Sequence, residues 1–160
     1  MGLHRHVRDR RFTWLFALVF TVFLFPTVLW AAEEQDAILG TWKLTATFPA
    51  GNVDNALITF SPGGGLVMDS RGRPGGPTEE WTSGHGTWVH RGGNTFAFAF
   101  EQFVIRDGEY IRSSRVDETM SITGDTYQGK FQGRSVSPDG KISPVGVTGT
   151  TSAVRLKLLE

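Results

Sequence analysis

The chain has 160 residues, with 16 basic (Lys and Arg) and 16 acidic (Asp and Glu) side chains and no cysteine. The absence of cysteine excludes disulfides, thiolate chemistry and Cys-based zinc sites. Basic residues beyond the N-terminal segment are scattered rather than clustered, so nucleic acid is not an expected partner. No motif predicts a bound cofactor.

The N-terminal segment 1–31 has the pattern of a secretory signal peptide. Arginines between positions 5 and 11 precede the apolar run Phe12–Leu29, and the small residues Ala31 and Ala32 follow. A basic start, an apolar centre and a small-residue end are the features of a cleaved leader. We therefore predict that the protein is secreted or periplasmic, with cleavage after Ala31 or Ala32. Because the apolar run is long, an uncleaved membrane anchor is the alternative, and this segment is the expected contact with a membrane.

Beyond the leader, we expect a short linker at 32–37 and a single domain at 38–160. The leader contains four Arg and one Asp, so 12 basic and 15 acidic residues remain in this part of the chain. A mildly acidic domain of this length can build its own core without disulfides.

The domain shows the alternation of β-strands and no convincing helical period. In the first expected strand, Trp42, Leu44 and Ala46 alternate with polar residues. The further extended segments, separated by turn residues, are 55–60, 65–69, 84–90, 95–123, 127–137, 141–148 and 153–159. The longest irregular connection is 70–83. Eight or nine strands joined by hairpin turns predict an all-β, antiparallel up-and-down meander. We expect it to close into a small eight-stranded barrel, because closure removes the free edges; a two-sheet sandwich is the alternative.

The longest hairpin, 95–123, folds at Asp107-Gly108, a dipeptide that suits a tight hairpin turn. Its first arm alternates phenylalanine with alanine, so one face is packed. Every second residue of the other arm gives a mostly apolar face with three polar members: Tyr110, Arg112, Ser114, Val116, Glu118, Met120 and Ile122. We therefore predict a polar cluster inside the barrel.

A charge inside a barrel needs a partner. Arg112 and Glu118 lie about 20 Å apart along one strand, which is too far for a direct ion pair. Partners are expected from neighbouring strands, with Glu101, Gln102 and Arg134 as candidates. A bulge that turns Arg112, Ser114 and Glu118 outward is the alternative.

Most of the aromatic residues are expected to be core, because side chains fill the interior of a small barrel. The functional alternative is an aromatic-lined cavity, in which some of them form the apolar part of the ligand site. Phe98, Phe100 and Tyr127 are expected on interior faces, and Trp81 on a lid formed by 70–83. The complete predicted ligand-binding set is Arg112, Ser114, Glu118, Tyr110, Phe98, Phe100, Tyr127 and Trp81. Glu118 and Arg112 are the candidates for acid–base catalysis. His85 and His90 face opposite sides of one strand because their spacing is odd, so no metal site is predicted.

The tripeptide Gly40-Thr41-Trp42 resembles the first-strand motif of the calycin superfamily, the lipocalin-like barrels. The resemblance implies that Trp42 packs across the closed end of the barrel, with Arg155 as the arginine from near the last strand. On that strand, Val154, Leu156 and Leu158 share the face opposite Arg155. The pattern after Gly84 is also similar to bacterial barrels of the allene-oxide-cyclase-like type, some of which are cyclases acting on apolar substrates, whereas others have no known activity.

Together, these observations predict an exported calycin-like barrel that binds a small, largely apolar molecule in its lumen, with Arg112 and Glu118 at the polar end of the ligand. One alternative is a cyclase or isomerase acting on an apolar substrate. The other is a structural or protein-interaction barrel without a ligand.

Overall fold

The computed structural model describes residues 36–71, 79–144 and 146–159. The predicted leader (1–31) and residues 32–35 of the predicted linker (32–37) lie outside these residues, and both assignments stay predictions. None of the helices in the described residues has the length and apolar character needed to span a membrane.

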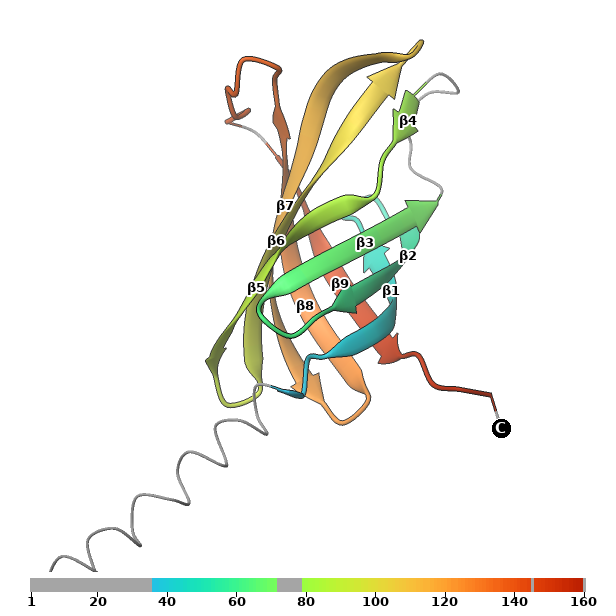
Figure 1. Ribbon diagram of the computed structural model, residues 1–160, viewed down its shortest axis with the longest axis vertical. Coiled ribbons are helices and arrows are strands. Elements are labelled where there is room, and N and C mark those ends of the chain that lie inside the picture. The colour runs from blue at the N-terminus through green and yellow to red at the C-terminus, as the bar shows by residue number, and fades with distance from the viewer. Residues whose placement is uncertain (1–35, 72–78, 145, 160) are drawn as a thin grey trace, which may run out of the picture. The chain divides into compact units, whose positions relative to one another are not determined.

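The described residues form nine β-strands (Figure 1). In chain order they are β1 (Gly40–Thr47), β2 (Val53–Phe60), β3 (Gly65–Arg71), β4 (Glu79–Trp81), β5 (Gly84–Gly92), β6 (Thr95–Arg106), β7 (Glu109–Thr123), β8 (Thr126–Val136) and β9 (Val147–Arg155).

Eight of these strands close into an antiparallel barrel. Apart from β4, each strand pairs with the next in the sequence, and β9 returns to pair with β1. The short β4 pairs with the far part of β6, beside the strands of the barrel. The predicted closed meander is therefore confirmed, and the sandwich alternative is excluded.

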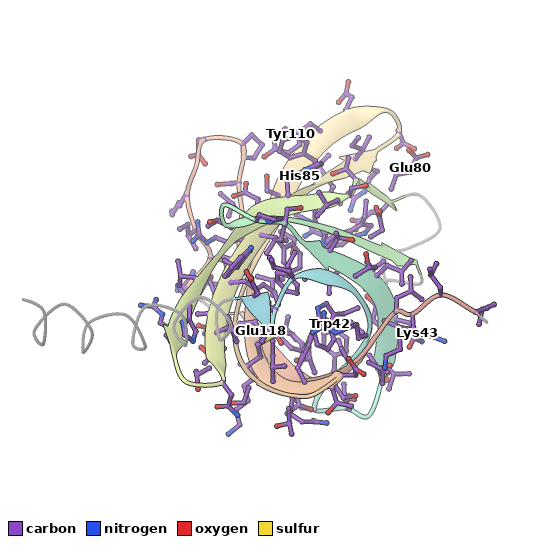
Figure 2. The ribbon with its side chains drawn as sticks, turned by 60° about the horizontal axis from the view of Figure 1, so that its bottom comes forward. Trp42, Lys43, Glu80, His85, Tyr110 and Glu118 are labelled. Carbon is purple, nitrogen blue, oxygen red and sulfur yellow. The ribbon has the colours of Figure 1, made fainter. Side chains whose placement is uncertain are left out.

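The interior of the barrel is filled by the inward-facing residue of each alternating pair. On β6, Phe96, Phe98 and Phe100 are buried, as the alternation predicts. Further large buried side chains come from the strands around them: Trp42, Ile58, Phe60, Trp88, Met120 and Tyr127. Seen from one end of the barrel, Trp42 lies inside the ring of strands and Lys43 outside it (Figure 2). These residues leave little open space along the axis.

The last strand differs from the sequence prediction. We expected strands at 141–148 and 153–159, but β9 spans Val147–Arg155, and only an isolated bridge joins Val136 to Ile142. Pro144 lacks the backbone N–H that a ladder needs, which limits pairing in this segment. Leu158 and Leu159 extend past the strand and are exposed.

The β6–β7 hairpin turns at Asp107 and Gly108, both with positive φ (54° and 82°), as predicted. Its register shifts once: Val104 pairs with Arg112, but Ile105 pairs with Tyr110. The extra residue between the pairs is a bulge. It leaves the predicted face intact from Arg112 onward and rotates Tyr110 away from it. The tip of this hairpin and β4 lie together at one end of the barrel (Figure 1).

Candidate functional site

One end of the barrel is closed by Trp42, which is 0% exposed. Its indole Nε1 donates a hydrogen bond to the Ile38 carbonyl (2.8 Å), and its ring lies 5.4 Å from the Tyr127 ring. The Arg155 guanidinium stacks over the indole, 4.1 Å from the ring centroid. The packing that the calycin resemblance implies for Trp42 and Arg155 is therefore present.

Arg155 faces the barrel although its strand carries aliphatic residues on the other side. Thr151 and Ala153 share its face and are buried, whereas Val154 is 57% exposed. The guanidinium donates to the carbonyls of Leu39 and Ala37 and to the Asp125 carboxylate. Backbone acceptors that strand pairing leaves open thus explain why the arginine, and not the valine, points inward.

Glu118 lies in the middle of the barrel and is 5% exposed. Its carboxylate accepts a hydrogen bond from the Thr151 hydroxyl. Gly129 makes this contact possible, because a Cβ at that position would collide with both side chains. Burial raises the pKa of Glu118 to about 7, and the hydrogen bond from Thr151 only partly opposes this effect. Glu118 is therefore a neutral acid at mildly acidic pH.

The cavity beside Glu118 has a volume of about 50 Å³. Its wall includes Phe98, Phe100, Phe131 and the buried Asp54. A space of this size holds one or two water molecules, whereas ligand pockets usually measure several hundred cubic ångströms. The lumen around Phe98 and Phe100 is therefore packed core rather than the open ligand chamber that we predicted.

A pocket of about 740 Å³ opens at the end of the barrel opposite Trp42. We call it the mouth pocket. Its apolar wall includes Phe48, Val53, Val116, Phe131 and Val147, and its polar wall includes Asn52, Asp54, Arg112, Ser114, Arg134 and Ser135. The Phe48 and Phe131 rings pack edge to face at 5.4 Å. Because Val116 and Phe131 also line the cavity beside Glu118, the two spaces are neighbours.

Arg112 is the cationic group on the inner face of β7 at the mouth. It forms an ion pair with Glu79 on β4 (3.1 Å) and lies over the Trp81 ring, 5.1 Å from its centroid. Glu79 also pairs with Arg106, and these arginines, Arg106 foremost, hold the pKa of Glu79 below its ordinary value. The arginine side chain keeps 31% of its surface exposed and so remains open to the pocket.

The structure brings together three of the predicted site residues, Arg112, Ser114 and Trp81, at the mouth pocket. It separates the others from this group. Glu118, Phe98 and Phe100 lie deeper, around the small cavity, and Tyr127 packs against Trp42 at the closed end.

Tyr110 does not belong to the site. The bulge rotates it to the outer face of the hairpin, where it is 44% exposed and packs against Phe103 at a ring distance of 5.3 Å. Its hydroxyl hydrogen-bonds to Ser113 (2.9 Å). The prediction that Tyr110 contacts a ligand is therefore not supported by its position.

The partners proposed from the sequence for the two charges are also corrected. Arg112 forms its ion pair with Glu79 rather than with Glu101 or Gln102, and Glu118 is held by Thr151 rather than by Arg134, which donates to Gln132. Glu79 lies in the segment that we expected to be an irregular connection. The sequence signal for the pair of Arg112 and Glu79 was the position of Glu79 two residues before Trp81, the tryptophan of the candidate lid.

Metal ligation finds no support in the described ranges. There, no group of three or more His, Asp or Glu side chains could hold an ion. His85 is exposed, and a ring nitrogen of His90 hydrogen-bonds to the Gly93 carbonyl (2.7 Å).

A further hollow of about 680 Å³ lies against the outside of the β5–β8 wall. Its lining includes outward-facing short side chains such as Thr87, Ala97 and Ala99. It is more open than the mouth pocket and lacks a partly buried cation aimed into an apolar space, so the mouth pocket is the better candidate site.

Neither a protein-family model nor a curated protein matches the sequence. Among solved structures, the chain is similar to the S-type phycobiliprotein lyase CPES from Guillardia theta. The two share 14% sequence identity with a TM-score of 0.41, over 81% of this chain and 94% of that chain. A likeness this distant carries no argument, so the site is assigned from the geometry of this chain alone.

Proposed function

We propose that this protein binds a small, largely apolar molecule in the mouth pocket, with Arg112 at the polar end of the ligand. The observation that carries the proposal is a mostly apolar pocket of about 740 Å³ whose wall contains the partly exposed guanidinium of Arg112, with Arg134 as a second arginine. This volume falls in the range of small-molecule sites, and mostly apolar walls with a few polar groups are typical of them.

The apolar and polar walls of the mouth pocket would contact different parts of the ligand. Burying the apolar body of a ligand against Phe48, Val116 and Phe131 provides affinity in proportion to the area removed from water. Arg112 offers N–H groups beyond the one that bonds to Glu79, and a carbonyl, carboxylate or similar acceptor can use them. Trp81 and Glu79 hold the guanidinium in place, so little side-chain entropy is lost when a ligand binds.

An enzyme is the weaker alternative. Glu118, with its raised pKa, has the character of an acid–base group. Its cavity of about 50 Å³, however, is too small for the reacting part of an apolar cyclase or isomerase substrate. The hypothesis of a protein-interaction barrel is consistent with the packed interior. It gives no role, however, to the apolar mouth pocket.

A blocking substitution tests the proposal. Ser114→Trp places a large side chain in the mouth pocket, whereas Arg115→Trp places the same side chain on the outer face of the same strand. We expect the wild type and Arg115→Trp to bind the neutral apolar dye Nile red saturably, and Ser114→Trp to bind it at least about tenfold more weakly. Equal binding by the two variants would remove the mouth pocket as the site.

The location that accompanies this function is also a proposal. The signal-peptide pattern at 1–31 supports export to the periplasm or beyond. Expression of the full chain in a bacterial host, followed by mass spectrometry of the protein recovered outside the cytoplasm, tests it. An N-terminus at Ala32 or Glu33 supports cleavage, and retention of the intact chain in the membrane fraction supports the anchor.

A further inference from the structure

We propose that the mouth pocket and Glu118 are coupled, so that the protein takes up a proton when it binds its apolar ligand. This inference rests on the proposed function and adds the way in which pH regulates it. It also gives a role to the buried Glu118, which does not line the mouth pocket.

The coupling follows from shared walls. Phe48, Val116 and Phe131 line both the mouth pocket and the cavity beside Glu118. Val116 precedes Glu118 by two residues on the inner face of β7, and Phe131 is the cross-strand partner of Glu118 on β8. An apolar ligand seated on these side chains therefore covers the route by which solvent reaches the carboxyl group.

The surroundings of Glu118 favour its neutral form. No Lys, Arg or His in the described part of the chain forms an ion pair with it, and β9 contributes only the Thr151 hydroxyl. Two titratable groups face it: Asp54 of β2 lines the same cavity and would repel an anion, and the buried Tyr127 hydroxyl of β8 forms no hydrogen bond with it. The facing residues of β6 and β1, Phe98 and Leu44, carry no charge.

Ionised Glu118 thus depends on the Thr151 hydroxyl and on water in a cavity of about 50 Å³. A ligand that dries the shared wall removes part of this solvation and raises the pKa of Glu118 above its value of about 7 in the free protein. By linkage, the ligand then binds more tightly to the protonated protein, and each unit of pKa shift corresponds to about a tenfold difference in affinity.

The experiment measures binding of Nile red by the full chain at about pH 5.5 and about pH 8.5, on either side of the titration. This dye is uncharged, so it contributes no titration of its own. We expect the wild type to bind about five- to tenfold more weakly at the higher pH. Glu118→Gln is expected to bind equally at both pH values, because its amide stays neutral. The control Asp117→Asn changes the next residue, which points outward, and should keep the wild-type dependence.

A second measurement on the wild type needs no variant. Calorimetric titration near pH 7 in two buffers of different ionisation enthalpy reports the protons taken up per ligand, and we expect a net uptake of a fraction of a proton. Equal affinity at both pH values, zero proton uptake, or a pH dependence that persists in Glu118→Gln and disappears in Asp54→Asn would overturn the coupling. If no variant and no pH gives binding, the proposed function itself fails, which is a distinct result.

Discussion

The two ends of this barrel use the same pair of side chains for different purposes. At the closed end, Arg155 stacks over Trp42 at 4.1 Å, and at the open end Arg112 lies over Trp81 at 5.1 Å. Each arginine also pairs with a carboxylate, Asp125 in the first case and Glu79 in the second. An arginine on a tryptophan is therefore not by itself the sign of a binding site.

The two arginines differ in how many of their N–H donors a ligand could still use. Arg155 donates to two backbone carbonyls besides its carboxylate, and the Trp42 beneath it is fully buried. Arg112 has Glu79 as its one hydrogen-bond acceptor among the described residues, and it lines a pocket of about 740 Å³. Satisfied donors over a buried ring make a structural plug, whereas spare donors beside an apolar space make a ligand anchor.

Replacing each tryptophan in turn should give the largest difference in stability between the two ends of the barrel. We expect Trp42→Ala to lower the free energy of unfolding by about 3–5 kcal/mol, because it empties a fully buried site and leaves Arg155 without its ring. Trp81→Ala should cost about 1 kcal/mol or less, because Trp81 is only partly buried. Urea unfolding of the two variants measures both values, and equal losses would contradict the division between plug and anchor.

Glu118 lies between the two ends, and the pH dependence of stability that it causes tests whether water is excluded from the interior. The pKa of Glu118 is raised from 4.5 to about 7, so the folded protein holds its proton more tightly than the unfolded chain does. The resulting stabilisation is complete below about pH 4.5, declines as the pH rises, and is lost above about pH 7. Its full size is roughly 3 kcal/mol.

Chemical unfolding at a series of pH values measures this decline. In Glu118→Gln, the decline in the free energy of unfolding between about pH 4.5 and about pH 7 that Glu118 causes should be absent, since the amide does not titrate. If the variant keeps the whole wild-type slope in this interval, the interior around Glu118 is wet and its carboxyl group titrates normally.

The barrel could be predicted from the sequence because the signals for strands and turns come from residues that are close together in the chain. Alternation of Phe96, Phe98 and Phe100 marks a packed face, and Asp107-Gly108 marks the turn that joins β6 to β7. Both depend on neighbours in the chain, and both are confirmed. The alternation also holds on β7 from Ser114 to Ile122, which is why Ser114 and Glu118 lie on the interior side as expected.

The misplaced residues depend on contacts between distant segments. A single-residue bulge moved Tyr110 to the other face, and alternation carries no signal for such a shift. Glu79 became the partner of Arg112 because β4 docks on β6, and three residues are too few to show a strand period. On β9, Arg155 faces the barrel and Val154 faces outward, and the carbonyls of Ala37 and Leu39, which accept from the guanidinium, lie outside that strand.

A smaller change at the plug sharpens the comparison between the arginines. We expect Arg155→Met to lower the free energy of unfolding by about 2 kcal/mol, because it removes three hydrogen-bond donors and the charge over Trp42. Thermal and urea unfolding both measure this loss. A loss below about 0.5 kcal/mol would show that the plug depends on apolar packing of Trp42 alone.

The smallest effect on stability is expected at the mouth, where the effect on binding should be clear. Arg112 and Arg106 both hold Glu79, but only Arg112 lines the mouth pocket. Each Met substitution should change the free energy of unfolding by less than about 1 kcal/mol, as for partly exposed ion pairs. Arg112→Met should weaken binding of an apolar ligand that ends in a hydrogen-bond acceptor by about tenfold, whereas Arg106→Met should leave it unchanged. Comparing such a ligand with its methyl-terminated analogue by fluorescence displacement isolates the polar contact. Equal weakening in the two variants would assign the effect to the position of Glu79 and not to a bond from Arg112 to the ligand.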